Sequence, residues 1–175
     1  PNTANIGLEH TDITTNERGA IVVNDTCESS VPGVYAVGDV NGGPQFTYIS
    51  LDDFRIVFGA LTGNSSYTLK DRKNIPYTTF LTPPLARVGL TEEDAINKGY
   101  TVKTKEMLVA TMPRAHVNDY LKGAFKIVVD AENNLILGAT LYSQGAEELI
   151  NLIKMAMDNN IPYTYFKNQI FTHPT

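Results

Sequence analysis

The chain is poor in cysteine, because Cys27 is the single one among its 175 residues. One thiol excludes an internal disulfide, and it excludes any metal cluster held by several cysteines of this chain. Cys27 lies between two turn-like segments and belongs to no metal-binding or redox motif. We therefore expect it to be inert, with a reactive thiol as the alternative, and we expect no metal site.

The chain also lacks an excess of basic charge and a long apolar run. Its 14 lysines and arginines stand against 19 acidic residues, which gives a net charge of −5. That balance argues against a nucleic-acid-binding surface and against a polybasic membrane patch. No apolar run approaches the roughly 18 residues that span a bilayer, and residues 1–5 are too polar to begin a secretory signal. These absences predict a cytoplasmic protein.

Neither end looks like the end of a complete protein. The first residue is Pro1 and not methionine, and the chain stops at Thr175 without a polar tail. We expect a piece of a longer protein.

Residues 1–66 are expected to form a first unit. Short β-branched runs at residues 20–23 and 34–37 predict strands, the first of them buried. Residues 48–61 predict an amphipathic helix, because apolar side chains recur there at helical spacing, and Gly63 is a suitable stop. The apolar face of this helix carries Leu51, Phe54, Val57, Phe58 and Leu61.

A polar stretch at residues 67–74 predicts a linker, and residues 75–175 are expected to form a second unit. Strand-like runs occupy residues 75–81, 85–90, 100–111, 125–129 and 135–142, with a hairpin turn at 130–134. A capping-box pattern at residues 91–94 opens a short helix that ends near Gly99. Residues 146–159 predict another helix, with a core face made of Leu149, Ile150, Leu152, Ile153 and Ala156. The second unit is therefore α+β, with helices packed on antiparallel strands.

Gly38 and Asp39 form the most informative pair of the sequence. They follow a β-branched run and precede a glycine-rich turn, which places Asp39 at the carboxyl end of a strand, where α/β sheets bind ligands. An ionised carboxylate accepts hydrogen bonds and donates none, so it suits sugar or polyol hydroxyls and suits a phosphate badly. We expect this pair to contact the sugar-like part of a nucleotide cofactor. A helix-capping or turn aspartate is the alternative.

The start of the following helix is a second candidate site. Unpaired amides at a helix N-terminus carry a partial positive charge, which stabilises negative charge on a ligand. The anionic form of a reduced flavin ring is one such ligand. The backbone of Gln45, Phe46 and Thr47 lies where it would face it. An ordinary helix entry explains the same residues equally well.

His173 is the third candidate, because an ordinary imidazole has a pKa of about 6.5 and suits proton transfer. Its bond to Pro174 can be cis, which would fix the direction of the ring. A structural histidine is the alternative. His10 and His116 have no comparable context and remain unassigned.

Taken in order, these motifs resemble the C-terminal part of the flavin-dependent pyridine nucleotide-disulfide oxidoreductases. Members of that family include glutathione reductase, dihydrolipoamide dehydrogenase and mercuric reductase. Residues 1–3 are similar to the end of the family's NAD(P)H domain, residues 34–39 to its second FAD fingerprint, and residues 171–175 to its terminal H-P-T motif. The resemblance implies the end of a doubly wound FAD-binding domain over residues 1–66 and an α+β dimerisation domain over residues 75–175.

The resemblance also implies roles for single residues. Asp39 would bind the ribityl or sugar hydroxyls of FAD. His173 would reach the active site of the partner subunit in a homodimer and act there as acid-base for a redox dithiol. Residues 43–53, 82–89 and 169–174 look more closely like the bacterial branch tied to reactive-chlorine resistance, whose members reduce hypothiocyanous acid with NAD(P)H. Mercuric reductase-like and dihydrolipoamide dehydrogenase-like parents are the alternatives.

The departures from the family pattern limit what this chain can do alone. The first glycine-rich FAD motif, the C-x4-C redox pair and the NAD(P)H motif are absent from it. We therefore expect the chain alone to be inactive and to hold FAD weakly, with NAD(P)H and a small-molecule substrate used by the full-length parent. A stand-alone dimerisation module without chemistry and an unrelated nucleotide-binding protein with Asp39 on a ribose stay open.

Overall fold

The computed structural model describes residues 1–175 as two compact units, with the chain boundary between Arg72 and Lys73. Part of the segment expected to be a linker is folded onto the first unit. It contains a 3-10 turn, η3 (Leu69–Asp71), closed by a capping box between Thr68 and Asp71. The Leu69 N–H donates to the carbonyl of Asp25 at 2.9 Å. Residues 68–72 therefore belong to the first unit.

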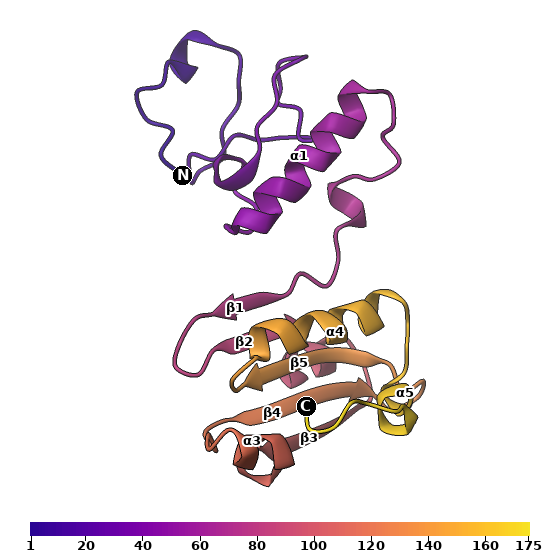
Figure 1. The fold of residues 1–175 in the computed structure, drawn as a ribbon. Helices are drawn as coiled ribbons and strands as arrows, with labels where there is room; N and C mark the ends of the chain where they lie inside the picture. Colours follow the sequence, from indigo (N-terminus) through magenta and orange to yellow (C-terminus); the bar gives the residue numbers. More distant parts are fainter. The chain divides into compact units, whose positions relative to one another are not determined.

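The first unit, residues 1–72, is built around the helix α1 (Thr47–Leu61), as predicted (Figure 1). Two further 3-10 turns, η1 (Leu8–His10) and η2 (Gly38–Asn41), interrupt otherwise irregular chain. Gly63 takes a φ of +76° just after α1, which suits a residue without Cβ. The helix buries Ile49, Asp53 and Ile56. The expected apolar face is mostly exposed, at Leu51, Phe54, Phe58 and Leu61.

The two strands predicted in the first unit do not form, and that prediction is wrong. Residues 20–23 pair only through the single bridge Thr15↔Ile21, and residues 34–37 only through Glu28↔Tyr35. Turns closed by the Gly19 N–H on Asn16 and by the Cys27 N–H on Asn24 bend the backbone before further pairs can form. Ala20 and Ile21 are nevertheless buried, as expected of the apolar run, whereas Val22 is exposed.

The second unit, residues 73–175, contains a five-stranded antiparallel sheet in the order β1-β2-β5-β4-β3 (Figure 1). Its strands are β1 (Tyr77–Thr79), β2 (Leu85–Gly89), β3 (Val102–Leu108), β4 (Ala124–Asp130) and β5 (Ile136–Tyr142). The hairpin β4–β5 turns at residues 131–135, close to the predicted turn. The α+β prediction for this unit is confirmed.

The core of the second unit lies between the sheet and the helix α4 (Ala146–Asp158). The buried cluster consists of Ala86, Val88, Ala139, Leu141, Ala146 and Ile150. Ile150 and Ala156 of α4 are buried as predicted, but Leu149 and Leu152 are exposed, so their assignment to the core is wrong. They lie on a second apolar stripe of α4 that turns away from the sheet.

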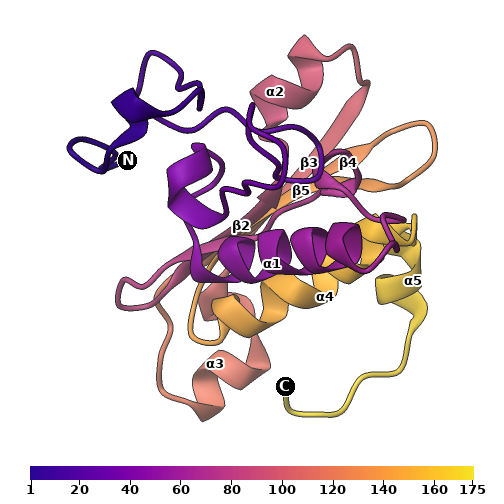
Figure 2. The same cartoon turned by 90° about the horizontal axis from the view of Figure 1, so that it is seen from above.

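Three short helices complete the second unit. The helix α2 (Glu92–Asn97) begins with the predicted capping box, in which Thr91 and Asp94 each accept a backbone N–H of the other. The helices α3 (Pro113–Val117) and α5 (Tyr163–Asn168) are too short to give a periodic signal and were not predicted. After α5 the chain continues to Thr175 without regular structure (Figure 2). None of the helices combines the length and apolar character needed to cross a bilayer.

Candidate functional site

The turn that carries Gly38 and Asp39 is tightly shaped. Gly38 is buried with a φ of +70°, and it opens the 3-10 turn η2, which Gly42 closes with a φ of +76°. A Cβ added to Gly38 would lie 2.9 Å from the Oγ of Ser50 on α1, so the turn packs directly against the helix. Only glycine fits this backbone and this contact without strain.

Asp39 lies inside η2 and not at the end of a strand, which corrects the expected local structure. The reason is that residues 34–37 make a single bridge in place of a ladder. Its side chain is exposed, and no donor of the chain contacts its carboxylate. The carboxylate is therefore available to accept hydrogen bonds from hydroxyls of a ligand.

A buried carboxylate beneath the turn escaped the sequence reasoning. Asp53 of α1 has an exposed fraction of 0%. Its Oδ2 accepts the Gly38 N–H at 2.7 Å and an Asn41 Nδ2–H at 2.9 Å, and its Oδ1 accepts from Arg72 Nη2 at 2.5 Å. Arg72 Nε also donates to Asp52 at 2.8 Å. Burial opposes charge on Arg72, but these two carboxylates outweigh it and raise the pKa of the guanidinium.

Residues 45–47 lead into α1 as predicted. Phe46 is the N-cap residue, with an extended φ of −136°, and Thr47 begins the helix. Gln45 and Thr47 are exposed, whereas Phe46 is half-buried and stacks on Tyr48 with ring centroids 5.1 Å apart. No side chain caps this end, and the first N–H groups of a helix have no acceptor within the helix.

A hollow of about 870 Å³ adjoins this helix start. Its lining combines the glycine-rich turn with the segment 16–20, and comprises Pro1, Asn16, Glu17, Arg18, Ala20, Gly42, Gly43, Gln45 and Phe46. The structure thus brings Gln45 and Phe46 into one hollow. Gly38, Asp39 and Thr47 lie on neighbouring residues of the chain but do not line it.

Cys27 is fully buried, with an exposed fraction of 0%. Burial raises the pKa of its thiol to about 11, and the nearby charge of Asp53 acts in the same direction. Because the thiolate is the reactive form, this environment suits an unreactive residue. No group of three or more His, Cys, Asp or Glu side chains is placed to hold a metal ion.

His173 lies in the exposed C-terminal segment of the second unit, and its bond to Pro174 is cis. Arg114 Nη1 donates to the carbonyl of Pro174 at 3.3 Å, which attaches this segment to α3. Phe171 stacks on Phe166 of α5, with ring centroids 6.4 Å apart. Within its unit, the structure brings no other candidate residue to His173.

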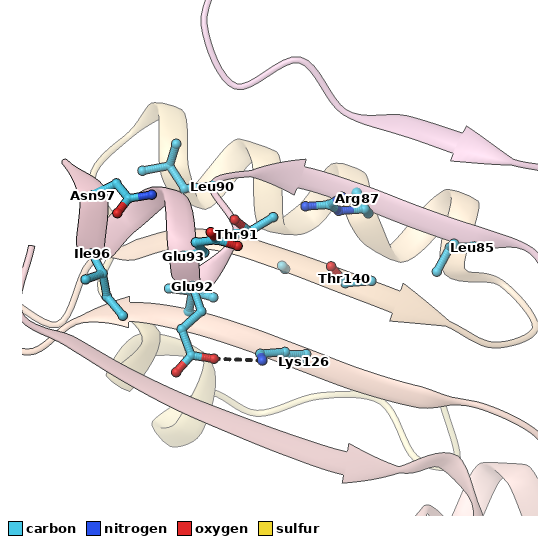
Figure 3. Close-up of a pocket in the computed structure, with 12 residues that line it drawn as sticks. Leu85, Arg87, Leu90, Thr91, Glu92, Glu93, Ile96, Asn97, Lys126 and Thr140 are labelled. Atoms are coloured by element: carbon cyan, nitrogen blue, oxygen red, sulfur yellow. Dashed lines mark hydrogen bonds and ion pairs between the residues drawn. The ribbon is translucent and has the colours of Figure 1, made fainter.

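A second hollow, of about 690 Å³, lies between α2 and the sheet face that α4 does not cover (Figure 3). Arg87, Thr140 and Lys126 stand in one register row across β2, β5 and β4. Lys126 already pairs with Glu92 at 2.8 Å and with Glu106 at 3.3 Å. These glutamates cancel the positive charge of the row, and none of the predicted site residues lines the hollow, so it supports no assignment.

Two family models match the chain. The model of the pyridine nucleotide-disulphide oxidoreductase dimerisation domain covers residues 75–175, and the pyridine nucleotide-disulphide oxidoreductase model covers residues 1–53. The probable pyridine nucleotide-disulfide oxidoreductase RclA of Escherichia coli is 46% identical over the whole chain, which spans 40% of that protein. A mercuric reductase of Staphylococcus aureus is 35% identical over 90% of the chain, which spans 28% of that protein.

A solved structure gives the same picture. The HOCl-induced flavoprotein disulfide reductase RclA of E. coli matches with a TM-score of 0.96 and 46% identity, over 100% of this chain and 40% of that one. The chain thus spans less than half the length of the relatives that it matches. The expected fold class, the end of an FAD-binding domain followed by a dimerisation domain, is confirmed by these matches.

Proposed function

Because this chain belongs to the pyridine nucleotide-disulphide oxidoreductase family, we propose that it is the part of an FAD-dependent NAD(P)H oxidoreductase that completes the flavin site and forms the dimer. The observation that carries this proposal is the Gly38-Asp39 turn. Its exposed carboxylate has no partner in the chain, and the turn leads within a few residues into an uncapped helix start. A flavin nucleotide needs groups of both kinds, because its sugar-like part carries hydroxyls that donate hydrogen bonds and its reduced ring carries negative charge.

The chemical groups of these residues suit FAD. Asp39 would accept hydrogen bonds from ribityl or sugar hydroxyls, and the backbone at Gln45, Phe46 and Thr47 would face the negative charge of the flavin ring. When bound, FAD supplies the transfer of electrons between NAD(P)H and the redox centre of the protein. The chain's own contribution is to hold and orient the cofactor.

Direct measurement of bound flavin tests this role. In the complete reading frame that encodes this chain, we expect a purified protein with flavin absorption and about one FAD per chain. Asp39→Ala is expected to lose flavin on dilution, whereas Asp39→Asn, which keeps an acceptor oxygen, retains more of it. A wild-type protein that binds no flavin, or an Asp39→Ala protein that retains it fully, contradicts the proposal.

The second unit carries the dimerisation domain, and we propose that it pairs two copies of the chain. The exposed stripe of α4, formed by Leu149, Leu152 and Met155, is an apolar surface that its own unit does not cover. We propose that the segment from Ile75 to Leu81, in which Phe80 and Leu81 are exposed, contributes a second apolar face. Analytical ultracentrifugation of the 175-residue chain should show a dimer, and Leu152→Glu should weaken it. A strict monomer at high concentration contradicts this role.

His173 is proposed as the acid-base that serves a redox dithiol in the partner subunit. Its support is the match to the dimerisation-domain model, which includes the terminal segment. His173→Gln in the complete reading frame should slow steady-state turnover by roughly 10²–10⁴-fold. Reduction of the flavin by NAD(P)H, followed by stopped flow, should stay unchanged. Loss of both steps would contradict an acid-base role confined to the dithiol.

The proposed substrate is a disulfide-like or oxidised thiol compound, with hypothiocyanous acid as the first choice. The resemblance to a reductase that is induced by HOCl favours it, whereas the similarity to mercuric reductase keeps Hg²⁺ as the second candidate. Comparison of kcat/KM for hypothiocyanous acid, lipoamide and Hg²⁺ distinguishes the three candidate parents. A chain that dimerises but whose complete reading frame reduces none of them would support the non-catalytic dimerisation module.

A further inference from the structure

The buried carboxylate of Asp53 is the best-connected group of the first unit. It accepts three hydrogen bonds, from the Gly38 N–H, from Asn41 Nδ2 and from Arg72 Nη2. A charge removed from water is tolerated only when it is paired and hydrogen-bonded. Asp53 meets that condition, because Arg72 supplies the counter-charge and the two other donors come from the turn.

One oxygen of this carboxylate fixes both ends of the turn η2. Gly38 is the first residue of the turn and Asn41 is the last, and both donate to Oδ2 of Asp53. Asp39 lies between them, on the exposed side. The side chain of Asn41 also accepts the Gly43 N–H at 3.0 Å, which extends the same anchoring into the glycine-rich segment.

Arg72 holds the carboxylate from the other side. Its guanidinium contacts Asp53 through Nη2 and Asp52 through Nε, so one planar fork bridges two neighbouring carboxylates of α1. Lysine lacks that fork and cannot reproduce both contacts with the same geometry. Arg72 is also the last residue of the first unit, so the network connects the end of that unit to the turn.

We propose that Asp53, held by Arg72, is a positioning residue that keeps the 38–41 turn in the shape that presents Asp39 to the sugar hydroxyls of a flavin nucleotide. This inference rests on the proposed function of the turn. The helix α1 would then have two roles. Its N-terminus would face the flavin, and Asp53 in its middle would hold the 38–41 turn through hydrogen bonds.

Two measurements test the proposal. The first is hydrogen exchange of the backbone amides of residues 36–43 in the 175-residue chain. The second is the FAD dissociation constant of the complete reading frame, titrated into deflavinated protein. Asp53→Ala should raise both the exchange rate and the dissociation constant by roughly tenfold, since a charge-assisted hydrogen bond at each end of the turn is lost. Arg72→Lys should raise the exchange rate and the dissociation constant less than Arg72→Met does, because lysine keeps the positive charge.

Asp52→Asn is the matched control, because Asp52 is the adjacent carboxylate of α1 and contacts Arg72 but not the turn. It leaves the contacts between Asp53 and the turn in place, so it should change both quantities less than Asp53→Ala does. Asp53→Asn, which keeps the size of the side chain, guards against a variant that fails to fold. Circular dichroism checks that α1 and the second unit remain folded in each variant.

The outcomes separate the two claims. Unchanged exchange at residues 36–43 in both Asp53 variants overturns the positioning role. Faster exchange with an unchanged FAD dissociation constant overturns the link between the turn and the flavin. A wild-type protein that binds no FAD refutes the proposed function, and the exchange result then still decides whether Asp53 holds the turn.

Discussion

Gly38→Ala is the substitution that most directly tests how the turn η2 packs against α1. The alanine would have to adopt a φ of +70°. Its methyl group would lie 2.9 Å from Ser50 Oγ and 3.3 Å from Ser50 Cβ. The left-handed backbone costs about 1–2 kcal/mol for a residue other than glycine. Crowding in a packed site adds about 1–3 kcal/mol. We expect the free energy of unfolding of the first unit to fall by about 2–5 kcal/mol.

A second substitution separates the two costs. Ser50→Gly removes the atoms that the new methyl group would meet but leaves the backbone strain at residue 38. Alone it should cost less than about 1 kcal/mol, as expected for glycine within a helix. In the double variant the steric cost should disappear, which gives a favourable coupling energy of about 1–3 kcal/mol between the two sites.

The chain contains no tryptophan, so intrinsic fluorescence cannot report on the first unit alone. Hydrogen exchange of peptides from α1, measured by mass spectrometry across a urea series, gives the stability of this unit separately. The complete reading frame of Gly38→Ala should also lose FAD on dilution. If Gly38→Ala costs less than about 1 kcal/mol, or the double variant is merely additive, the direct packing of the turn against α1 is wrong.

Three further predictions concern single residues. Cys27, with a pKa of about 11, should react with a thiol reagent at pH 8 only after unfolding. At that pH roughly one folded thiol in a thousand is ionised. Its folded-state pKa lies above the ordinary 9.0, so this contribution to stability is present below pH 9 and is lost as the pH rises toward 11. Ile150→Ala in the core should lower the unfolding free energy of the second unit by about 2–5 kcal/mol in a urea titration followed by circular dichroism. Leu152→Ala, on the same helix but 48% exposed, should cost less than about 1 kcal/mol in the monomer. The pKa of Asp158 is lowered because hydrogen bonds from Lys154 and Asn74 outweigh its burial. Its contribution is present above pH 3.8 and lost as the pH falls below it, and Lys154→Met should flatten that acid limb of the stability curve.

The elements that sequence reasoning found are those whose signals are local. Periodicity gave α1 and α4, and the capping pattern at Thr91 gave the start of α2. The strands of the second unit were found because each of their apolar runs has an antiparallel partner in the sheet. Residues 20–23 and 34–37 have the same composition, but a strand also needs a partner of matching length, and composition does not encode the partner.

The face of a helix is harder to predict than the helix itself. In α4, residues 149 and 152 form one apolar stripe and residues 150 and 153 form the next, so periodicity alone assigns all four to the core. The sheet covers only the stripe of Ile150. Leu149 and Leu152 remain outside, which is the arrangement that a helix shared between a core and an interface requires.

Asp53 was missed for a related reason, because periodicity assigned the other apolar stripe of α1 to the core. An aspartate among apolar residues of an amphipathic helix is ordinarily assigned to the solvent side. Yet Asp53 follows Ile49 by four residues and precedes Ile56 by three, so it lies on the stripe that α1 buries. An acidic residue on a buried stripe requires donors, and the turn that ends at Asn41 and the guanidinium of Arg72 supply them. In the proposed arrangement, the position of Asp39 therefore depends on a carboxylate that lies 14 residues further along the chain.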